Sequence, residues 1–216
     1  MRITRRQVQI ALGLLWFADG VFQLKPAMFT HQFLSAVILP TAQMQPYWIA
    51  QSVLFGAHLI EPDVALWNVL FASIQFLIGV MLLANIRVRL ALLISFAWSI
   101  IVWCFGEGFG QLWIGSATLL TGAPGAVLLY ALVGCTIYPW PTADRTGIHT
   151  VLARRALAVL WIMGAILQLQ PAYLEGGIWR QAVTVPVLAS ILAVHPGGRH
   201  SCSGHTSRHD GPAAAL

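Results

Sequence analysis

The chain has 216 residues, of which 58% are hydrophobic and only 9% are charged. A soluble domain carries about 25% charged residues, so this composition excludes a soluble protein and indicates an integral membrane protein. The net charge of +5 does not indicate a nucleic-acid partner, because the arginines lie in short clusters between apolar stretches, where positive charge orients helices in the bilayer.

Five apolar stretches are candidates to cross the hydrocarbon, which takes roughly 17–25 residues of helix. They cover residues 7–24, 64–86, 90–105, 124–138 and 156–169. We expect Pro124 in the first turn of the fourth helix, because an N–H at that position would have no partner within the helix. A sixth stretch, 182–194, is shorter and carries Pro186, so a further span and an interfacial segment both remain open.

The segment 26–63, between the first two spans, is more than a loop. It has apolar residues at helical spacing, namely Phe29, Phe33, Val37 and Ile38. Pro40 and Pro46 then break the pattern before a second apolar stretch, 47–60. We expect this insert to form helical pieces that lie along the membrane interface or dip into the bundle.

Basic residues are distributed unequally between the two sides of the membrane that this span assignment defines. If the N-terminus is cytoplasmic, the inner segments hold Arg2, Arg5, Arg6, Arg87, Arg89, Arg145, Arg154 and Arg155. The outer segments hold only Lys25 and Arg180. Because basic residues accumulate in cytoplasmic segments, we expect a multi-pass protein of the bacterial inner (plasma) membrane with its N-terminus in the cytoplasm.

An ungapped repeat relates residues 11–29 to residues 156–174. Eight aligned positions are identical: Ala11/Ala156, Leu12/Leu157, Leu15/Leu160, Trp16/Trp161, Gln23/Gln168, Leu24/Leu169, Pro26/Pro171 and Ala27/Ala172. Four spans separate the two starts, so both copies cross in the same direction and the repeat is parallel.

The expected fold is therefore all-α, a polytopic transmembrane helical bundle with one four-helix unit, a partial parallel repeat and an interfacial helical insert. Residues 1–140 form the four-span unit, and residues 141–155 form a cytoplasmic loop. Residues 156–194 begin the second unit. Residues 195–216 are polar and rich in Gly, Ser and His, a composition typical of a disordered tail.

Metal binding is not expected. His31 and His58 lie in the insert at no fixed spacing, and a lone histidine in such a helix is usually just a polar side chain. The tail histidines, with Cys202, match the spacing of no closed site.

Asp19 lies well inside the first span, where an ionisable residue is costly and faces a partner or water. On a helix it shares one face with Trp16 and Gln23. Two interpretations remain open: a carboxylate that handles protons or orients a ligand, and a hydrogen bond between helices. The repeat has Gly164 at the position of Asp19, so only the first copy carries this carboxylate.

Two further charged residues stand at the outer end of the bundle. Glu107 lies among glycines and aromatic residues in FGEGFG, where it either lines a small-molecule pocket or is a solvated turn residue. Lys25 either extends to the interface or pairs with Asp19 or Glu107. Together with Gln23, these residues are the candidate functional side chains.

Whole segments of the chain look like an uncharacterised group of bacterial multi-pass proteins. These segments are LLWFADGVFQLKPAMF, WNVLFASIQFLIGVMLL, AWSIIVWCFGEGFG and LLTGAPGAVLLYAL. The chain also resembles the DoxX/DoxD superfamily of four-helix membrane proteins, through Arg6, Gly13, Gly20 and Lys25 and the four-span plan. That second resemblance implies a subunit of a quinone-linked redox system.

The sequence favours a membrane protein that binds or supports a protein partner or a small lipophilic ligand, and that is not an enzyme on its own. A quinone-handling redox subunit, with Asp19, Lys25 and Glu107 lining the site, and a small-solute transporter are the alternatives. The partners we expect are the lipid bilayer and either another membrane protein or a second copy of the chain. Quinone is the one cofactor that the alternatives suggest.

Overall fold

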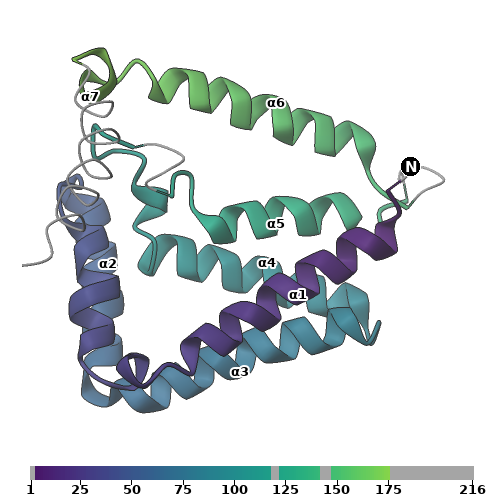
Figure 1. Ribbon diagram of the computed structural model, residues 1–216, viewed down its shortest axis with the longest axis horizontal. Helices are drawn as coiled ribbons and strands as arrows, with labels where there is room; N and C mark the ends of the chain where they lie inside the picture. The colour runs from purple at the N-terminus through teal and green to yellow at the C-terminus, as the bar shows by residue number, and fades with distance from the viewer. Residues whose placement is uncertain (1–2, 118–121, 142–146, 176–216) are drawn as a thin grey trace, which may run out of the picture. The chain divides into compact units, whose positions relative to one another are not determined.

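The computed structural model describes residues 3–117, 122–141 and 147–175, and every regular element within them is helical (Figure 1). In chain order the elements are α1 (Arg5–Gln23), η1 (Pro26–Phe29), η2 (Leu34–Ile38), η3 (Leu39–Ala42), α2 (Tyr47–Ile60), η4 (Glu61–Asp63), α3 (Val64–Leu83), α4 (Val88–Phe105), η5 (Phe109–Gln111), α5 (Ala126–Ile137), α6 (Thr150–Leu167) and α7 (Pro171–Leu174). The expected all-α class is confirmed for these residues.

Three described helical segments are long and apolar enough to cross a membrane. They are Tyr47–Leu83, Val88–Phe105 and Thr150–Leu167. Val88–Phe105 contains the expected span 90–105, and Thr150–Leu167 overlaps the expected span 156–169. Tyr47–Leu83 joins most of 64–86 to the stretch 47–60, which was expected to be interfacial. The expected spans 7–24 and 124–138 are not among these three segments. The chain therefore has the helices of a membrane protein. The proposed sixth span at 182–194 and the tail from 195 lie outside the described residues.

The helix boundaries differ from expectation at two places. The fourth expected helix starts at Ala126, so Pro124 precedes it and does not occupy its first turn. The reason is Gly125, which separates the two with a φ of +107°, a backbone conformation suited to glycine. The last expected loop, 141–155, is also partly helical, because α6 already begins at Thr150. His149 caps this helix, since its side chain accepts a hydrogen bond from the N–H of Leu152 at 3.1 Å.

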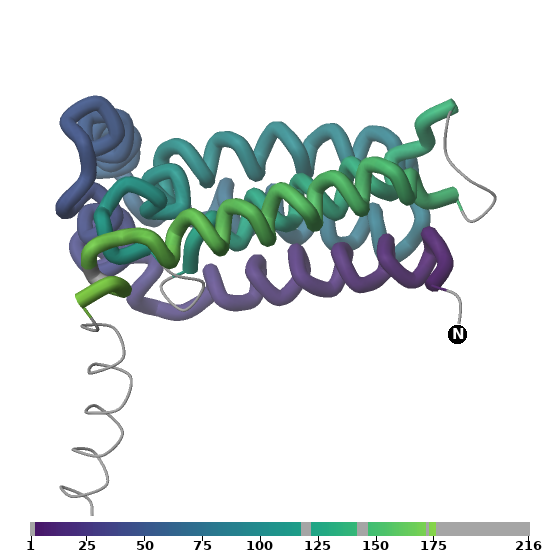
Figure 2. The backbone as a smooth tube through the Cα atoms, turned by 90° about the horizontal axis from the view of Figure 1, so that it is seen from above, coloured from purple at the N-terminus to yellow at the C-terminus, as the bar shows by residue number. Residues whose placement is uncertain are grey.

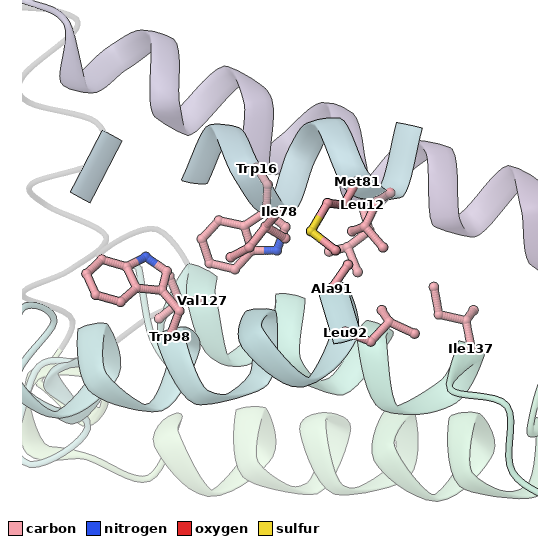
Figure 3. Close-up of a cluster of buried hydrophobic side chains, with 10 residues drawn as sticks. Leu12, Trp16, Ile78, Met81, Ala91, Leu92, Trp98, Val127 and Ile137 are labelled. Carbon is pink, nitrogen blue, oxygen red and sulfur yellow. The ribbon is translucent and has the colours of Figure 1, made fainter. Parts of the chain in front are cut away.

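The larger hydrophobic core lies among four helices. α1 packs on α3, α3 on α4, α4 on α5 and α5 on α1. Figure 3 shows Trp16 and Trp98 in this cluster, among the side chains of Leu12, Ile78, Met81, Ala91, Leu92, Val127 and Ile137. Trp16 is completely buried. Its Nε1–H donates a hydrogen bond to Ser95 Oγ at 2.8 Å, and its ring meets that of Tyr130 edge to face at 5.1 Å.

Two glycines allow α1 and α3 to approach closely. A Cβ on Gly79 would stand only 2.9 Å from the backbone nitrogen of Phe17 and 3.0 Å from the backbone oxygen of Gly13. Small residues at such crossings let backbones pack directly in membrane bundles. At the other end of the crossing, Arg6 and Gln9 of α1 donate hydrogen bonds to the carbonyl oxygen of Leu82, at 2.9 and 2.7 Å. Side chains of α1 thus add hydrogen bonds to a carbonyl group in the last turn of α3, where helix carbonyl groups lack their usual partners.

The insert folds into a second hydrophobic core. The core is formed by Phe33, Leu34, Ile38, Val53, Ala57, Ile60 and Val64. α2 runs across the ends of the other helices. It is seen from the side in Figure 1 and nearly end-on in Figure 2. Thr41 and Gln45 fasten the insert to the loop after α4 by hydrogen bonds to the carbonyl oxygens of Gly106 (3.1 Å) and Gly108 (3.0 Å). The break expected at Pro46 is confirmed, because α2 starts directly after it.

The two copies of the sequence repeat have different surroundings. Leu12 and Trp16 of α1 are 1% and 0% exposed, whereas Leu157 and Trp161 of α6 are 56% and 74% exposed. α6 packs on α5, and Leu167 is the one residue of α6 that is fully buried. These two aligned residues are thus core residues in α1 and surface residues in α6.

Candidate functional site

A cavity of about 250 Å³ lies where the end of α1, the insert, α3 and α4 meet. Most of its wall is apolar and includes the rings of Phe33, Phe71 and Phe105. Four of its lining residues carry polar side chains: Gln23 of α1, Gln75 of α3, Trp98 of α4 and Glu107. An apolar pocket with a few convergent polar groups is the usual form of a small-molecule site.

Each of these four side chains has a buried polar atom without a hydrogen-bond partner among the described residues. The atoms are Gln23 Oε1, Gln75 Oε1, Trp98 Nε1 and Glu107 Oε2. Leaving a buried donor or acceptor unsatisfied costs about 1–3 kcal/mol, so such atoms are rare in isolation. Seven such atoms occur among the described residues, and four of them belong to side chains that line this cavity.

Glu107 lies just after α4 in the chain, and its carboxylate bonds the start of α5. The chain leaves α4 with the N–H groups of Gly106 and Glu107 both bonded to the carbonyl oxygen of Val102, each at 2.8 Å. The carboxylate then accepts backbone hydrogen bonds from Ala126 and from Val127, the latter to Oε1 at 3.5 Å. Negative charge is favourable at the N-terminus of a helix, and the N-cap Gly125 has no side chain that could provide it.

The close fit at this joint explains why residue 125 is glycine. A Cβ there would collide with Oε2 of Glu107 and would approach Cδ1 of Trp103 to 2.8 Å. Trp103 is itself fixed, because its Nε1–H donates to the carbonyl oxygen of Pro124 at 2.7 Å. The Glu107 carboxylate therefore has a defined position, with Oε1 bonded to α5 and Oε2 unpaired against Gly125.

Burial raises the pKa of Glu107 above its ordinary value. The hydrogen bonds from Val127 and Ala126 act in the opposite direction, and the nearby Asp19 carboxylate raises the pKa further. The site thus favours the protonated form of Glu107 more than water does.

Asp19 belongs to the same electrostatic group but does not line the cavity. It is half-buried in α1, and the hydroxyl of Tyr130 on α5 donates a hydrogen bond to its carboxylate. Glu107 is close enough to influence both residues electrostatically. Of the three side chains expected on one face of α1, Trp16 therefore lies in the core, Asp19 beside Tyr130, and Gln23 at the cavity.

Lys25 does not join this group. Its Nζ lies 5.1 Å from the centroid of the Phe22 ring, and its side chain is exposed. Within the described residues no ion pair connects it to Asp19 or Glu107. Pairing with either carboxylate, one of the two interpretations of Lys25, therefore has no support from the structure.

Histidine and cysteine side chains do not assemble a metal site in the part of the chain that the structure describes, where no three potential ligands come together. His31 is exposed, and the ring of His58 contacts the carbonyl oxygen of Leu54 at 2.7 Å. The tail histidines and Cys202 lie outside the described residues.

Three residues of this region were not among the candidates: Gln75, Trp98 and Tyr130. A sequence signal existed for the first. Asn68 and Gln75 are the two amide residues in a predominantly apolar helix, and their spacing of seven positions puts them on one face. Polar residues in a span usually face the bundle interior. Trp98 and Tyr130 carried no comparable signal, because aromatic residues are common throughout this chain.

Glu107 is expected to hold its proton above pH 4.5, the ordinary value for a glutamate. The folded chain binds this proton more tightly than the unfolded chain, so stability falls as the pH rises from the ordinary pKa through the raised one. Infrared titration should show a protonated carboxyl band that persists above pH 4.5 and is missing in Glu107→Gln. Thermal melting should depend less on pH in that variant.

The matched control is Glu175→Gln, which neutralises an exposed carboxylate at the end of α7. It should leave both the band and the pH dependence of melting unchanged. If the Glu107 band disappears at or below pH 4.5, burial of the carboxylate is not the dominant influence.

Comparison with models of known protein families, with curated proteins and with solved structures found no match to this chain.

Proposed function

We propose that this chain is a multi-pass protein of a bacterial inner membrane, with a cytoplasmic N-terminus, that binds a small lipophilic ligand in the cavity between Gln23, Gln75, Trp98 and Glu107. The excess of basic residues on the side of the N-terminus supports the orientation. In this topology residues 1–140 are a four-span unit and residues 156–194 begin a parallel repeat. The packing of α1, α3, α4 and α5 around one core supports the first part, and the aligned identities support the second.

The observation that carries the proposal is a cavity with apolar walls that four polar side chains also line, namely Gln23, Gln75, Trp98 and Glu107. A groove that only faces lipid needs no polar groups, whereas a small-molecule site combines apolar walls with a few polar side chains. The volume of about 250 Å³ suits one ring or a short branched chain. The ligand should therefore have an apolar body and a small polar head.

Binding can be tested with 4-propylphenol as the probe, by calorimetry on the full chain in lipid nanodiscs, with empty nanodiscs as the blank. We expect saturable binding of one molecule per chain. Gln23→Leu and Gln75→Leu should each weaken it by about three- to tenfold, since a neutral hydrogen bond contributes about 0.5–1.5 kcal/mol.

The repeat provides the control. Gln168 aligns with Gln23 but lies exposed directly after α6, so Gln168→Leu makes the same chemical change away from the cavity and should leave the affinity unchanged. If the probe does not bind saturably, or if the cavity variants bind it as the control does, the proposed function is wrong.

A quinone-handling redox subunit is the second candidate, and one observation favours it. Asp19, Tyr130 and Glu107 form a group of three proton-carrying side chains, and one of them lines the cavity. Such a group suits proton exchange with a bound ligand. This candidate predicts that quinone remains with the purified protein and is lost from Asp19→Asn and Glu107→Gln. Unchanged quinone content in both variants would exclude it.

A further inference from the structure

Three arginine side chains line one open hollow at the end of the bundle where α1 and α4 begin and α5 ends (Figure 1). They are Arg5 of α1, Arg89 of α4 and Arg87, the residue directly before α4. No acidic residue that the structure describes lines this hollow, and neither α1 nor α4 has one in its first turn. The hollow therefore holds positive charge that no described carboxylate offsets.

The side chain of Arg5 is half-buried and held in place from two sides. Its Nε–H donates a hydrogen bond to the carbonyl oxygen of Ile137, the last residue of α5, at 2.9 Å. Gly147 lies against the same side chain, since a Cβ there would approach Cδ of Arg5 to 3.0 Å. A guanidinium carries five N–H donors, and those on its two terminal nitrogens have no partner among the described residues. Arg5 can therefore give an anion the paired hydrogen bonds that arginine forms with phosphate.

An apolar groove of about 260 Å³ lies between α4 and α5 and begins beside the hollow. On α4, Arg89 lines the hollow, and Leu93, one turn further along the same face, lines the groove. After α5, Pro139 lines the hollow, and its neighbours Tyr138 and Trp140 line the groove. Both walls of the groove thus start at the arginines.

Aromatic side chains mark the level at which the groove meets the hollow. The rings of Tyr138 and Trp140 lie 4.8 Å apart, and the Trp140 Nε1–H donates to the carbonyl oxygen of Cys135 at 3.0 Å. Tyrosine and tryptophan are enriched at the level of the lipid headgroups. The helix α4, which is long and apolar enough to cross a membrane, begins at Val88. The arginines therefore lie at the membrane surface, and the groove runs from them toward the hydrocarbon.

We propose that this end of the bundle binds one anionic phospholipid, with its phosphate group in the hollow of Arg5, Arg87 and Arg89 and an acyl chain in the groove between α4 and α5. Basic pockets between membrane helices on the cytoplasmic side bind such headgroups, and this end is cytoplasmic in the proposed topology. A free phosphate would bond the arginines but leave the groove without an occupant. The lipid site shares no residue with the cavity at Glu107, so the two sites can be tested separately.

The test is a scintillation proximity assay on the full chain in a nonionic detergent. The two probes are tritiated phosphatidylglycerol, which is anionic, and tritiated phosphatidylcholine, which carries the same acyl chains but no net charge. We expect phosphatidylglycerol to bind at least about tenfold more tightly, because each basic residue near an anionic lipid contributes a factor of about five. Arg89→Gln should weaken phosphatidylglycerol binding by about that factor and reduce the preference between the two lipids.

Arg155→Gln is the matched control for the charge. Arg155 is exposed on α6, does not line the hollow and lies on the same side of the membrane in the proposed topology. Its replacement should leave both lipid affinities unchanged. If it weakens phosphatidylglycerol binding as much as Arg89→Gln does, the attraction comes from the overall positive charge of this side, and the proposed site is wrong.

The groove is tested with Leu93→Trp, which introduces a larger side chain into it. This variant should weaken the binding of both lipids. Leu77→Trp on α3 is the control, because Leu77 is exposed to a similar extent, 51% against 53% for Leu93, and does not line the groove. Displacement of the lipid by inorganic phosphate, or unchanged lipid binding in Leu93→Trp, would assign the hollow to a free phosphate and overturn the lipid site. Equal affinity for the two lipids would overturn the role of the arginines.

Discussion

Replacing Trp16 with alanine is expected to destabilise the protein by about 3–5 kcal/mol, the usual cost of removing a large buried aromatic side chain. The indole is completely buried, and its loss would leave Ser95 Oγ without its donor at 2.8 Å. Thermal unfolding in detergent, followed by size-exclusion chromatography of the soluble fraction, would measure the effect.

Trp161→Ala is the matched control, because Trp161 occupies the aligned position in α6 and is 74% exposed. Its effect should remain within about 0.5 kcal/mol, as for other surface substitutions. Trp16→Phe should fall between the two, since it keeps an aromatic ring but loses the hydrogen bond. Equal destabilisation by the two alanine variants would contradict the different environments of α1 and α6.

Replacing Gly79 with leucine is expected to separate α1 from α3 and to cost about 3 kcal/mol, the upper end of the usual range for overpacking. The atoms that a Cβ would meet are backbone atoms of Phe17 and Gly13, at 2.9–3.1 Å. Backbone atoms of a helix cannot rotate aside as a side chain can, so the whole crossing has to open. The melting assay used for Trp16 also applies here.

The control for this substitution is Gly164→Leu in α6, where a Cβ would meet nothing within 4 Å. It makes the same change of side chain in a helix of similar composition, so it corrects for the loss of backbone freedom. It should leave the melting temperature unchanged or raise it slightly. A large loss of stability in Gly164→Leu would show that the effect at Gly79 is not due to the helix crossing.

Helix positions could be predicted from the sequence because they depend on local properties. The stretch expected at 7–24 is α1 at Arg5–Gln23, and the stretch expected at 90–105 is α4 at Val88–Phe105. Length, apolarity and the prolines determine such boundaries. The α6 start was missed because Arg154 and Arg155 suggested a loop, although a helix near the membrane surface tolerates arginines.

The contacts between helices could not be predicted in the same way. In lipid, a residue that faces the bundle and one that faces the bilayer are both apolar, so sequence apolarity does not identify the packed face. Trp16 and Trp161 illustrate this, since identical residues in aligned segments lie in a core and on a surface. Of the polar residues that line the cavity, the sequence identified Gln23 and Glu107 as candidates. It did not identify Gln75 and Trp98, which come from two further helices.

The two oxygens of the Glu107 carboxylate differ in their hydrogen bonding, since one is bonded to α5 and the other has no partner among the described residues. Oε1 accepts from the first turn of α5, while Oε2 is buried against Gly125 without a hydrogen-bond partner among the described residues. Because both oxygens are fixed to one carbon, a rotation of the group that improves a bond on one side must lengthen a bond on the other. A ligand that moves the Glu107 side chain would therefore also change its hydrogen bonds to the first turn of α5.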